Sequence, residues 1–246
     1  MKKYHFILVL ISFGLMLSSC DEDEDNVENQ NQEITLTDID GNIYQTVTIG
    51  NQVWMAENLK TTTLNDGTPI TEYRHFDPNQ SSFSWIDTSN PQMLFQWADT
   101  SDLGNLYPDE LPFEFYGAHY NNETIVSGKL EIEGWRLPTQ QDFIELRDYV
   151  ASQGNSGNEA TVLKSEIGWF DSSINGTDQY GFNVKPAGNT ILGGTPDFAS
   201  LNARLCTSDI NPTNNKRKLA TFFDNDEISF EEMDVRNGFS VRLIKE

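Results

Sequence analysis

The sequence has few of the residues that build metal and redox sites. It holds two cysteines and three histidines in 246 residues. His5 lies at the start of an N-terminal leader, and neither His75 nor His119 has a cysteine near it in the sequence. Zinc sites need several clustered nitrogen or sulfur ligands, so no zinc site is expected. Cys20 and Cys206 are too few to form a disulfide framework.

Positive charge is scarce as well. The chain has 16 Lys and Arg residues against 38 Asp and Glu residues, which gives a formal net charge of −22. A surface this acidic repels phosphate groups, so binding of nucleic acid or of an anionic lipid surface by charge is not expected. The same charge favours solubility and leaves the surface tolerant of cations.

The motifs of common catalytic chemistry are also missing. The sequence has no glycine-rich phosphate loop, no Gly-x-Ser-x-Gly and no EF-hand loop. Asp77-Pro78-Asn79 matches a proline-centred calcium motif, but this tripeptide is more typical of a turn. Neighbouring acids such as Glu231-Glu232 are more typical of a solvated face in so acidic a chain. The sequence therefore predicts no catalytic residues, no metal site and no cofactor.

The N-terminus has the pattern of an export signal. Lys2-Lys3 precede an apolar run from Phe6 to Leu17 that is too short to span a bilayer comfortably. The run ends in Leu17-Ser18-Ser19-Cys20, which resembles a bacterial lipobox, whose cysteine is lipidated and becomes the mature N-terminus. We expect residues 1–19 to be a lipoprotein signal peptide and Cys20 to carry the lipid. The alternative is an ordinary secretory signal with an incidental cysteine.

An acidic segment follows the leader. Within residues 20–33, the side chains that follow Cys20 are almost all acidic or amide, a composition that cannot bury a core. We expect a disordered tether that holds the folded domain off the membrane. Its acidic run also resembles the surface-export signal of lipoproteins in the Bacteroidota. The expected location is the outer membrane, lipid-anchored and exposed at the cell surface.

The folded domain is expected over residues 34–246, beginning with short strands. Apolar residues alternate within 34–39 and 43–49, and the turn signals Asp40-Gly41 and Gly50-Asn51 follow these runs. The pattern predicts an antiparallel meander of three strands over residues 34–56.

The best helix start in the chain follows Pro138. Thr139 is a good N-cap, and Asp142, three residues later, can form a short capping box with it. Apolar side chains then recur at helical spacing, at Phe143, Leu146 and Val150. We expect Arg136 to be a structural ion-pair or carbonyl partner. Further elements are predicted as a helix over 158–167 and strands over 180–184, 203–208, 218–223 and 238–244.

Residues 71–128 are rich in aromatics and turn residues without a sustained period, which indicates packed loops. Sugars are held by flat aromatic rings together with amides and carboxylates, and this segment offers both. The candidate ligand-binding rings are Tyr73, Trp85, Trp97 and Tyr107. The alternative for each ring is core packing, because a domain of this size buries many aromatics.

Four segments together resemble one family of exported bacterial proteins. They are residues 47–59, Gly134 to Pro138, 180–188 and Gly238 to Arg242. Their order and spacing are similar to the Fibrobacter succinogenes major paralogous domain. The resemblance implies an α+β fold: a single compact domain of short antiparallel strands, two main helices and long loops, remotely similar to C-type-lectin-like and formylglycine-generating-enzyme folds. The chain departs from the family pattern in the 71–128 insertion and at Leu205 to Ser208.

Three hypotheses follow for function. The first is a lipid-anchored, non-catalytic surface module that binds a carbohydrate or glycoprotein, or adheres through one. The second is a structural or accessory subunit of an outer-membrane assembly. The third is an enzyme on the same scaffold, for which a pocket holding paired acids would be the sign.

Overall fold

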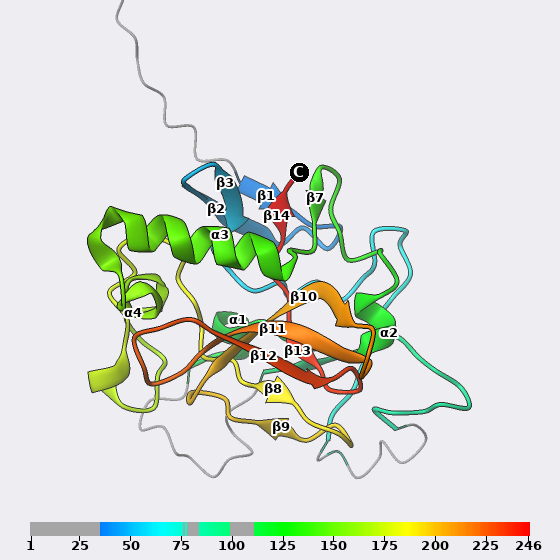
Figure 1. The fold of residues 1–246 in the computed structure, drawn as a ribbon. Helices are drawn as coiled ribbons and strands as arrows, with labels where there is room; N and C mark the ends of the chain where they lie inside the picture. Colours follow the sequence, from blue (N-terminus) through cyan, green and yellow to red (C-terminus); the bar gives the residue numbers. More distant parts are fainter. Residues whose placement is uncertain (1–34, 76, 78–83, 99–110) are drawn as a thin grey trace, which may run out of the picture. The chain divides into compact units, whose positions relative to one another are not determined.

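The described part of the chain consists of short strands and a few helices. The computed structural model describes residues 35–75, 77, 84–98 and 111–246, which belong to one compact unit (Figure 1). The predicted signal peptide, Cys20 and the predicted tether lie outside these residues. None of the described helices has the length and apolarity needed to cross a bilayer. The helical segments are α1 (Phe113–Tyr116), α2 (Asn122–Ile125), α3 (Gln140–Val150), a π-helical turn η2 (Ala151–Asn155), α4 (Glu159–Leu163) and a 3-10 turn η3 (Ser172–Ile174).

One sheet joins both ends of the domain. Its strand order is β1 (Thr35–Thr37), β2 (Ile43–Ile49), β3 (Gln52–Met55), β14 (Ile244–Lys245) and β7 (Trp135–Arg136). The first three strands pair antiparallel in sequence order, so the predicted meander is confirmed. Gly50 closes the β2–β3 turn with a φ of 62°, which a glycine adopts without the steric cost of a side chain.

The second sheet carries most of the remaining strands. Its order is β12 (Ser229–Asp234), β11 (Lys216–Phe222), β10 (Ala203–Asn211), β13 (Phe239–Ser240), β6 (Ala118–Tyr120), β5 (Leu94–Trp97) and β4 (Thr71–Glu72), and a separate hairpin joins β8 (Asn189–Thr190) to β9 (Pro196–Asp197). Strands β10 and β11 confirm two predictions; β10 runs on to Asn211, and β11 begins earlier than predicted, at Lys216, and ends at Phe222. The sequence did not predict β12, whose acidic residues hide the alternation of a strand. The mixed α+β class is confirmed.

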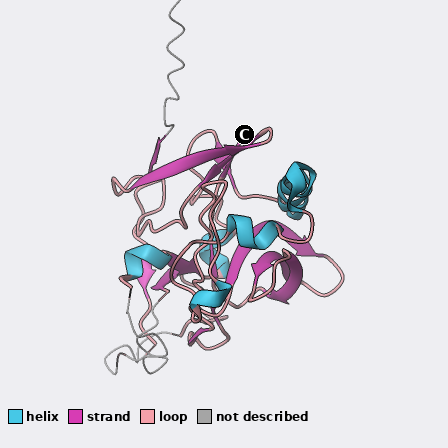
Figure 2. Ribbon diagram, turned by 90° about the vertical axis from the view of Figure 1, so that its left-hand side faces the viewer, coloured by secondary structure: helices cyan, strands magenta, loops and turns pink. Residues whose placement is uncertain are grey.

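Helix α3 begins as its local sequence predicts. The backbone N–H of Asp142 donates to the Thr139 hydroxyl at 3.2 Å, and the Asp142 carboxylate accepts from the Thr139 N–H at 2.6 Å. Arg136 donates to both Asp142 oxygens, at 2.7 and 2.8 Å, so it is an ion-pair partner. The apolar face of α3 is buried against a core shared with β10 and β11, and Figure 2 shows the helix end-on outside the sheets.

The last predicted strand is divided between the two sheets. Strand β13 pairs with β6 and β10, whereas β14 pairs with β3 and β7. The backbone between them crosses from one sheet to the other and accepts bonds from residues 55 and 59 instead. The side chains still alternate between the two core clusters, because Phe239, Val241 and Leu243 enter one cluster and Ile244 enters the other.

Two other predicted elements need correction. Helix α4 ends at Leu163, since Lys164 is extended and bridges to Val184. Residues 180–184 are not a strand. Asp178 and Asn183 adopt positive φ values of 43° and 56°, and the Asp178 carboxylate accepts the Asn183 N–H at 2.7 Å. These contacts fold the segment into a turn.

Candidate functional site

Two of the four candidate rings belong to the core. Trp85 is 2% exposed, its indole N–H donates to the Arg236 carbonyl at 3.1 Å, and its ring lies 5.5 Å from that of Tyr73. Tyr73 is also buried and donates its hydroxyl to the Gly193 carbonyl. A Cβ at Gly238 would come within 2.4 Å of the Trp85 ring, so the indole is packed against backbone. Neither ring offers a free face to a sugar, which corrects that prediction for both.

The other two candidates do not join them. Trp97 is partly buried and lies between Phe95 and Phe113, with ring centroids 5.2 and 4.4 Å away. Tyr107 lies outside the described residues. Trp97 packs against a different core cluster from the one that contains Tyr73 and Trp85. The described rings of this segment therefore do not form one binding surface.

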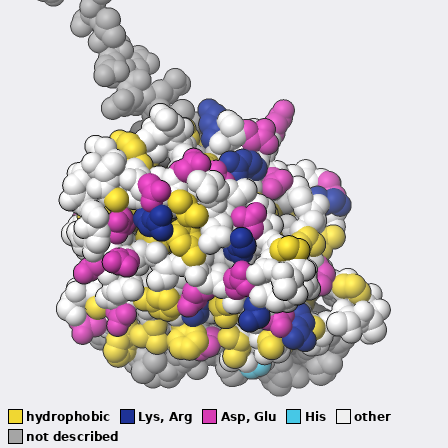
Figure 3. Space-filling view, viewed as in Figure 1, with side chains coloured by type: hydrophobic (Ala, Val, Ile, Leu, Met, Phe, Trp, Pro, Cys, Tyr) yellow, Lys and Arg dark blue, Asp and Glu magenta, His cyan; other side chains and the backbone are white. Residues whose placement is uncertain are grey.

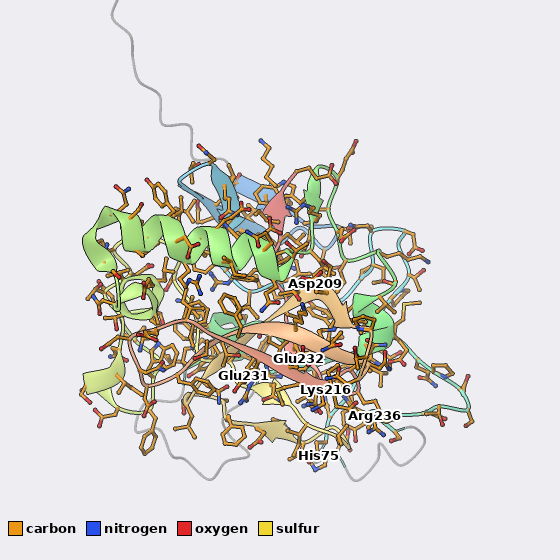
Figure 4. The ribbon with its side chains drawn as sticks, in the orientation of Figure 1. His75, Asp209, Lys216, Glu231, Glu232 and Arg236 are labelled. Carbon is orange, nitrogen blue, oxygen red and sulfur yellow. The ribbon has the colours of Figure 1, made fainter. Side chains whose placement is uncertain are left out.

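The acidic pair on β12 faces two ways. Glu231 accepts from Arg204 and Thr221, at 3.3 Å each, whereas Glu232 accepts from the side-chain amides of Asn211 and Asn214, at 2.8 Å each (Figure 4). Neighbouring strand residues point to opposite sheet faces. The two carboxylates therefore do not converge on one substrate position. Within the described ranges, no group of three or more His, Cys, Asp and Glu side chains is arranged to hold a metal ion.

Each of the two histidines of the folded domain contacts a threonine hydroxyl. His119 is buried on β6, with Nδ1 3.1 Å from the Thr190 hydroxyl. Burial lowers the pKa of His119 to about 4, because the cationic ring would lose its hydration there. His75 instead contacts the Thr195 hydroxyl at 3.2 Å, near the lower edge of the domain in Figure 4. At neutral pH His119 is therefore an uncharged packing residue.

A shallow groove lies between the β2–β3 turn and the last turn of α3. Its volume is about 270 Å³, close to the lower end of the range of about 300–1,000 Å³ for small-molecule sites. The Tyr149 ring, 38% exposed, is its aromatic wall. We call this site the Tyr149 groove, and it is lined by Ile49, Asn51, Gln52, Glu145, Asp148 and Tyr149.

The floor of the Tyr149 groove is held by packing and hydrogen bonds. A Cβ at Gly50 would lie 2.9 Å from Tyr149 Cδ2, so only a glycine lets the ring rest on the turn. The Gln52 amide donates to the Asp142 carbonyl at 3.0 Å and accepts the Trp54 indole N–H at 3.1 Å. These contacts fix the strand side of the groove against the helix. The ring is therefore positioned before any ligand arrives.

The rim of the groove presents hydrogen-bond acceptors. Glu145 accepts from the Gln141 amide through Oε1, and Asp148 accepts from the Arg147 guanidinium through Oδ1. The other oxygen of each carboxylate accepts no hydrogen bond from a described residue, and Asn51 is exposed on the opposite side. A carboxylate oxygen can accept from more than one donor, so the rim can take up hydroxyl or ammonium donors beside the ring.

Sequence reasoning missed Tyr149. One signal was present, because Glu145 and Tyr149 are four positions apart and therefore share a helix face. The other half of the groove is the turn at Gly50, which lies far away in the sequence. Only the packing of α3 beside β3 brings the turn and the ring together.

A second, smaller hollow of about 110 Å³ touches the edge of Trp85. Arg236 on its wall is paired with Asp234 at 2.6 Å, and Asp87 accepts bonds from its own turn, at Ser89 and Asn90. Two of its charged groups, Arg236 and Asp87, are thus already engaged, and its ring is buried. The Tyr149 groove is the better candidate.

The sequence profile of the Fibrobacter succinogenes major domain matches residues 47–245 of the chain. The matched range includes both the β2–β3 turn and α3, and so both sides of the Tyr149 groove. No match to a curated protein or to a solved structure is found.

Proposed function

The chain belongs to the Fibrobacter succinogenes major domain family, and within that family we propose that it is a lipid-anchored, non-catalytic binding or adhesion module of the outer cell surface. Its ligand is a carbohydrate or the glycan of a glycoprotein. The lipobox-like Leu17 to Cys20 and the acidic segment behind it support the location. We also propose a C-type-lectin-like fold, supported by the α+β composition and by β14 closing the first sheet beside β3.

The Tyr149 groove is the observation that carries this proposal. A pyranose has an apolar C–H face and a rim of hydroxyl donors. An exposed aromatic ring can cover the face, while carboxylates and amides accept from the hydroxyls. Tyr149, Glu145, Asp148 and Asn51 provide these groups around one hollow. The fixed floor limits the ordering cost of binding.

A glycan array tests this proposal. The protein for it begins at Asp21, which removes the leader and the lipidated cysteine and keeps the rest of the chain. We expect saturable binding to at least one class of glycan, lost when Tyr149 becomes Ala. Phe170→Ala is the matched control, because Phe170 is 45% exposed and does not line the groove. Absence of glycan binding, or equal binding by both variants, would rule out the groove as a sugar site.

A second candidate function rests on exposed apolar side chains. Phe170 and Phe198 lie near each other, since the Phe170 N–H donates to the Ser200 carbonyl at 2.8 Å, and both rings are exposed. On the face viewed in Figure 3, apolar side chains gather toward the lower edge. Such a patch fits a subunit of an outer-membrane assembly. Crosslinking on intact cells tests this second function. A defined crosslinked partner that is lost in the double variant Phe170→Ser with Phe198→Ser supports the assembly. Recovery of the monomer alone rejects it.

A further inference from the structure

The acidic rim of the Tyr149 groove carries an inference about which sugars it accepts. Glu145 and Asp148 lie three positions apart on α3, beside the same ring, and both side chains are exposed. Arg147 engages one oxygen of Asp148, and an uncharged amide engages one oxygen of Glu145. The groove lining contains two carboxylates and no cationic side chain.

This arrangement favours sugars that carry hydroxyl or ammonium donors over sugars that carry an anionic group. A hydroxyl or an ammonium group placed over the ring donates to the free carboxylate oxygens. A uronate, sulfate or phosphate in the same position faces the Glu145 carboxylate and the Asp148 carboxylate, and the neighbouring Arg147 guanidinium offsets only the charge of Asp148 in part. The net charge of −22 repels it further during approach, and salt screens that part of the effect.

We propose that the Tyr149 groove takes uncharged or amine-bearing sugars and excludes anionic ones, with Glu145 and Asp148 as the specificity-determining residues. This inference rests on the proposed carbohydrate-binding function. A sugar fits better than the basic side chain of a peptide. The groove has an exposed amide, Asn51, on the wall opposite the acids, whereas the Gln52 amide is already bonded to Asp142 and Trp54. Acceptors and a donor group therefore surround the ring, and a lysine ammonium would leave the Asn51 N–H donors without a role.

Matched oligosaccharides test the inference by calorimetric titration of the chain from Asp21 onward. One backbone is used in three forms: neutral, partly de-N-acetylated and uronate-bearing. We expect the anionic form to bind roughly fivefold or more weakly than the neutral form at low salt, because each exposed like-charge contact costs up to several-fold in affinity. In the double variant Glu145→Gln with Asp148→Asn, the ratio of the affinity for the neutral form to the affinity for the anionic form falls toward one.

The control variant carries Glu133→Gln with Glu166→Gln. It loses the same two charges at exposed positions outside the groove, so its ratio stays that of the unmodified protein. Equal binding of neutral and anionic forms, or an unchanged ratio in the groove variant, overturns the selectivity while the sugar site stands. Oligolysine, titrated in the same way, is the probe for a basic peptide. If no sugar form binds, or if only oligolysine binds, the proposed function itself fails.

Discussion

Arg242 is a buried arginine whose guanidinium needs hydrogen-bond acceptors inside the protein. It is fully buried and donates to Asn58 Oδ1 at 2.8 Å, to the Asn183 carbonyl at 2.8 Å and to the Phe182 carbonyl. Its guanidinium carbon also lies 4.9 Å from the centre of the Phe182 ring. Burial lowers the pKa of Arg242 to about 9, so it is still charged at neutral pH. One planar group thus joins the loop after β3, the 182–183 turn and the C-terminal segment.

Arg242→Ala is expected to lower the free energy of unfolding by about 3–5 kcal/mol, because two buried acceptors and one half-buried acceptor lose their donors. Arg242→Lys should recover only part of this, since an ammonium cannot match the planar fork. Urea unfolding measures both variants. Arg236→Ala removes an exposed, paired arginine and should cost no more than about 1 kcal/mol. A cost for Arg242→Ala as small as that of Arg236→Ala would contradict the structural role.

His119 makes the folded state sensitive to mild acid. Its pKa falls from 6.5 to about 4 on folding, so the unfolded chain takes up the proton first as the pH drops. Stability is therefore lost as the pH falls from about 6.5 to 4, by about 3 kcal/mol in total. Urea unfolding at several pH values measures this fall in the free energy of unfolding. The variant His119→Gln should show a smaller fall over the same pH range. Parallel curves for both proteins would show that His119 does not titrate as inferred.

At the scale of elements, the parts set by near neighbours in sequence were predictable. Thr139, Asp142 and Arg136 lie within a few residues of one another, and their mutual contacts start α3 as expected. The turns of the meander follow from glycine and short polar residues in the same way. The division of the last strand was not predictable, because it depends on partners in two different sheets.

Thr139→Ala is expected to destabilise the protein by about 1 kcal/mol, the usual cost of losing an N-cap oxygen. For a domain of this size the melting temperature should fall by about 2–4 °C. Differential scanning calorimetry measures the shift. Thr139→Ser keeps the hydroxyl and should restore most of the stability; a serine variant as unstable as the alanine one would mean that the cap oxygen is not the cause.

At the scale of the whole molecule, contacts between distant residues decide which aromatic rings are buried and which stay exposed. The Trp85 indole is buried partly by the Arg236 backbone, 151 positions away, which no local pattern of residues 71–128 reveals. The Tyr149 groove likewise needs the turn at Gly50 beside the end of α3. The sequence therefore allowed the family, the α+β class and the start of α3 to be predicted, but not the candidate site.

The central claim is that the Tyr149 ring is the surface on which a sugar stacks. Calorimetric titration with the best ligand from the array, comparing Tyr149→Ala with Phe170→Ala, tests it most directly. We expect Tyr149→Ala to weaken binding at least about tenfold, or about 1.4 kcal/mol, in a protein that is still folded at the assay temperature. Phe170→Ala should bind as the unmodified protein does. Equal affinities for all three proteins would contradict the account and move the binding surface elsewhere on the molecule.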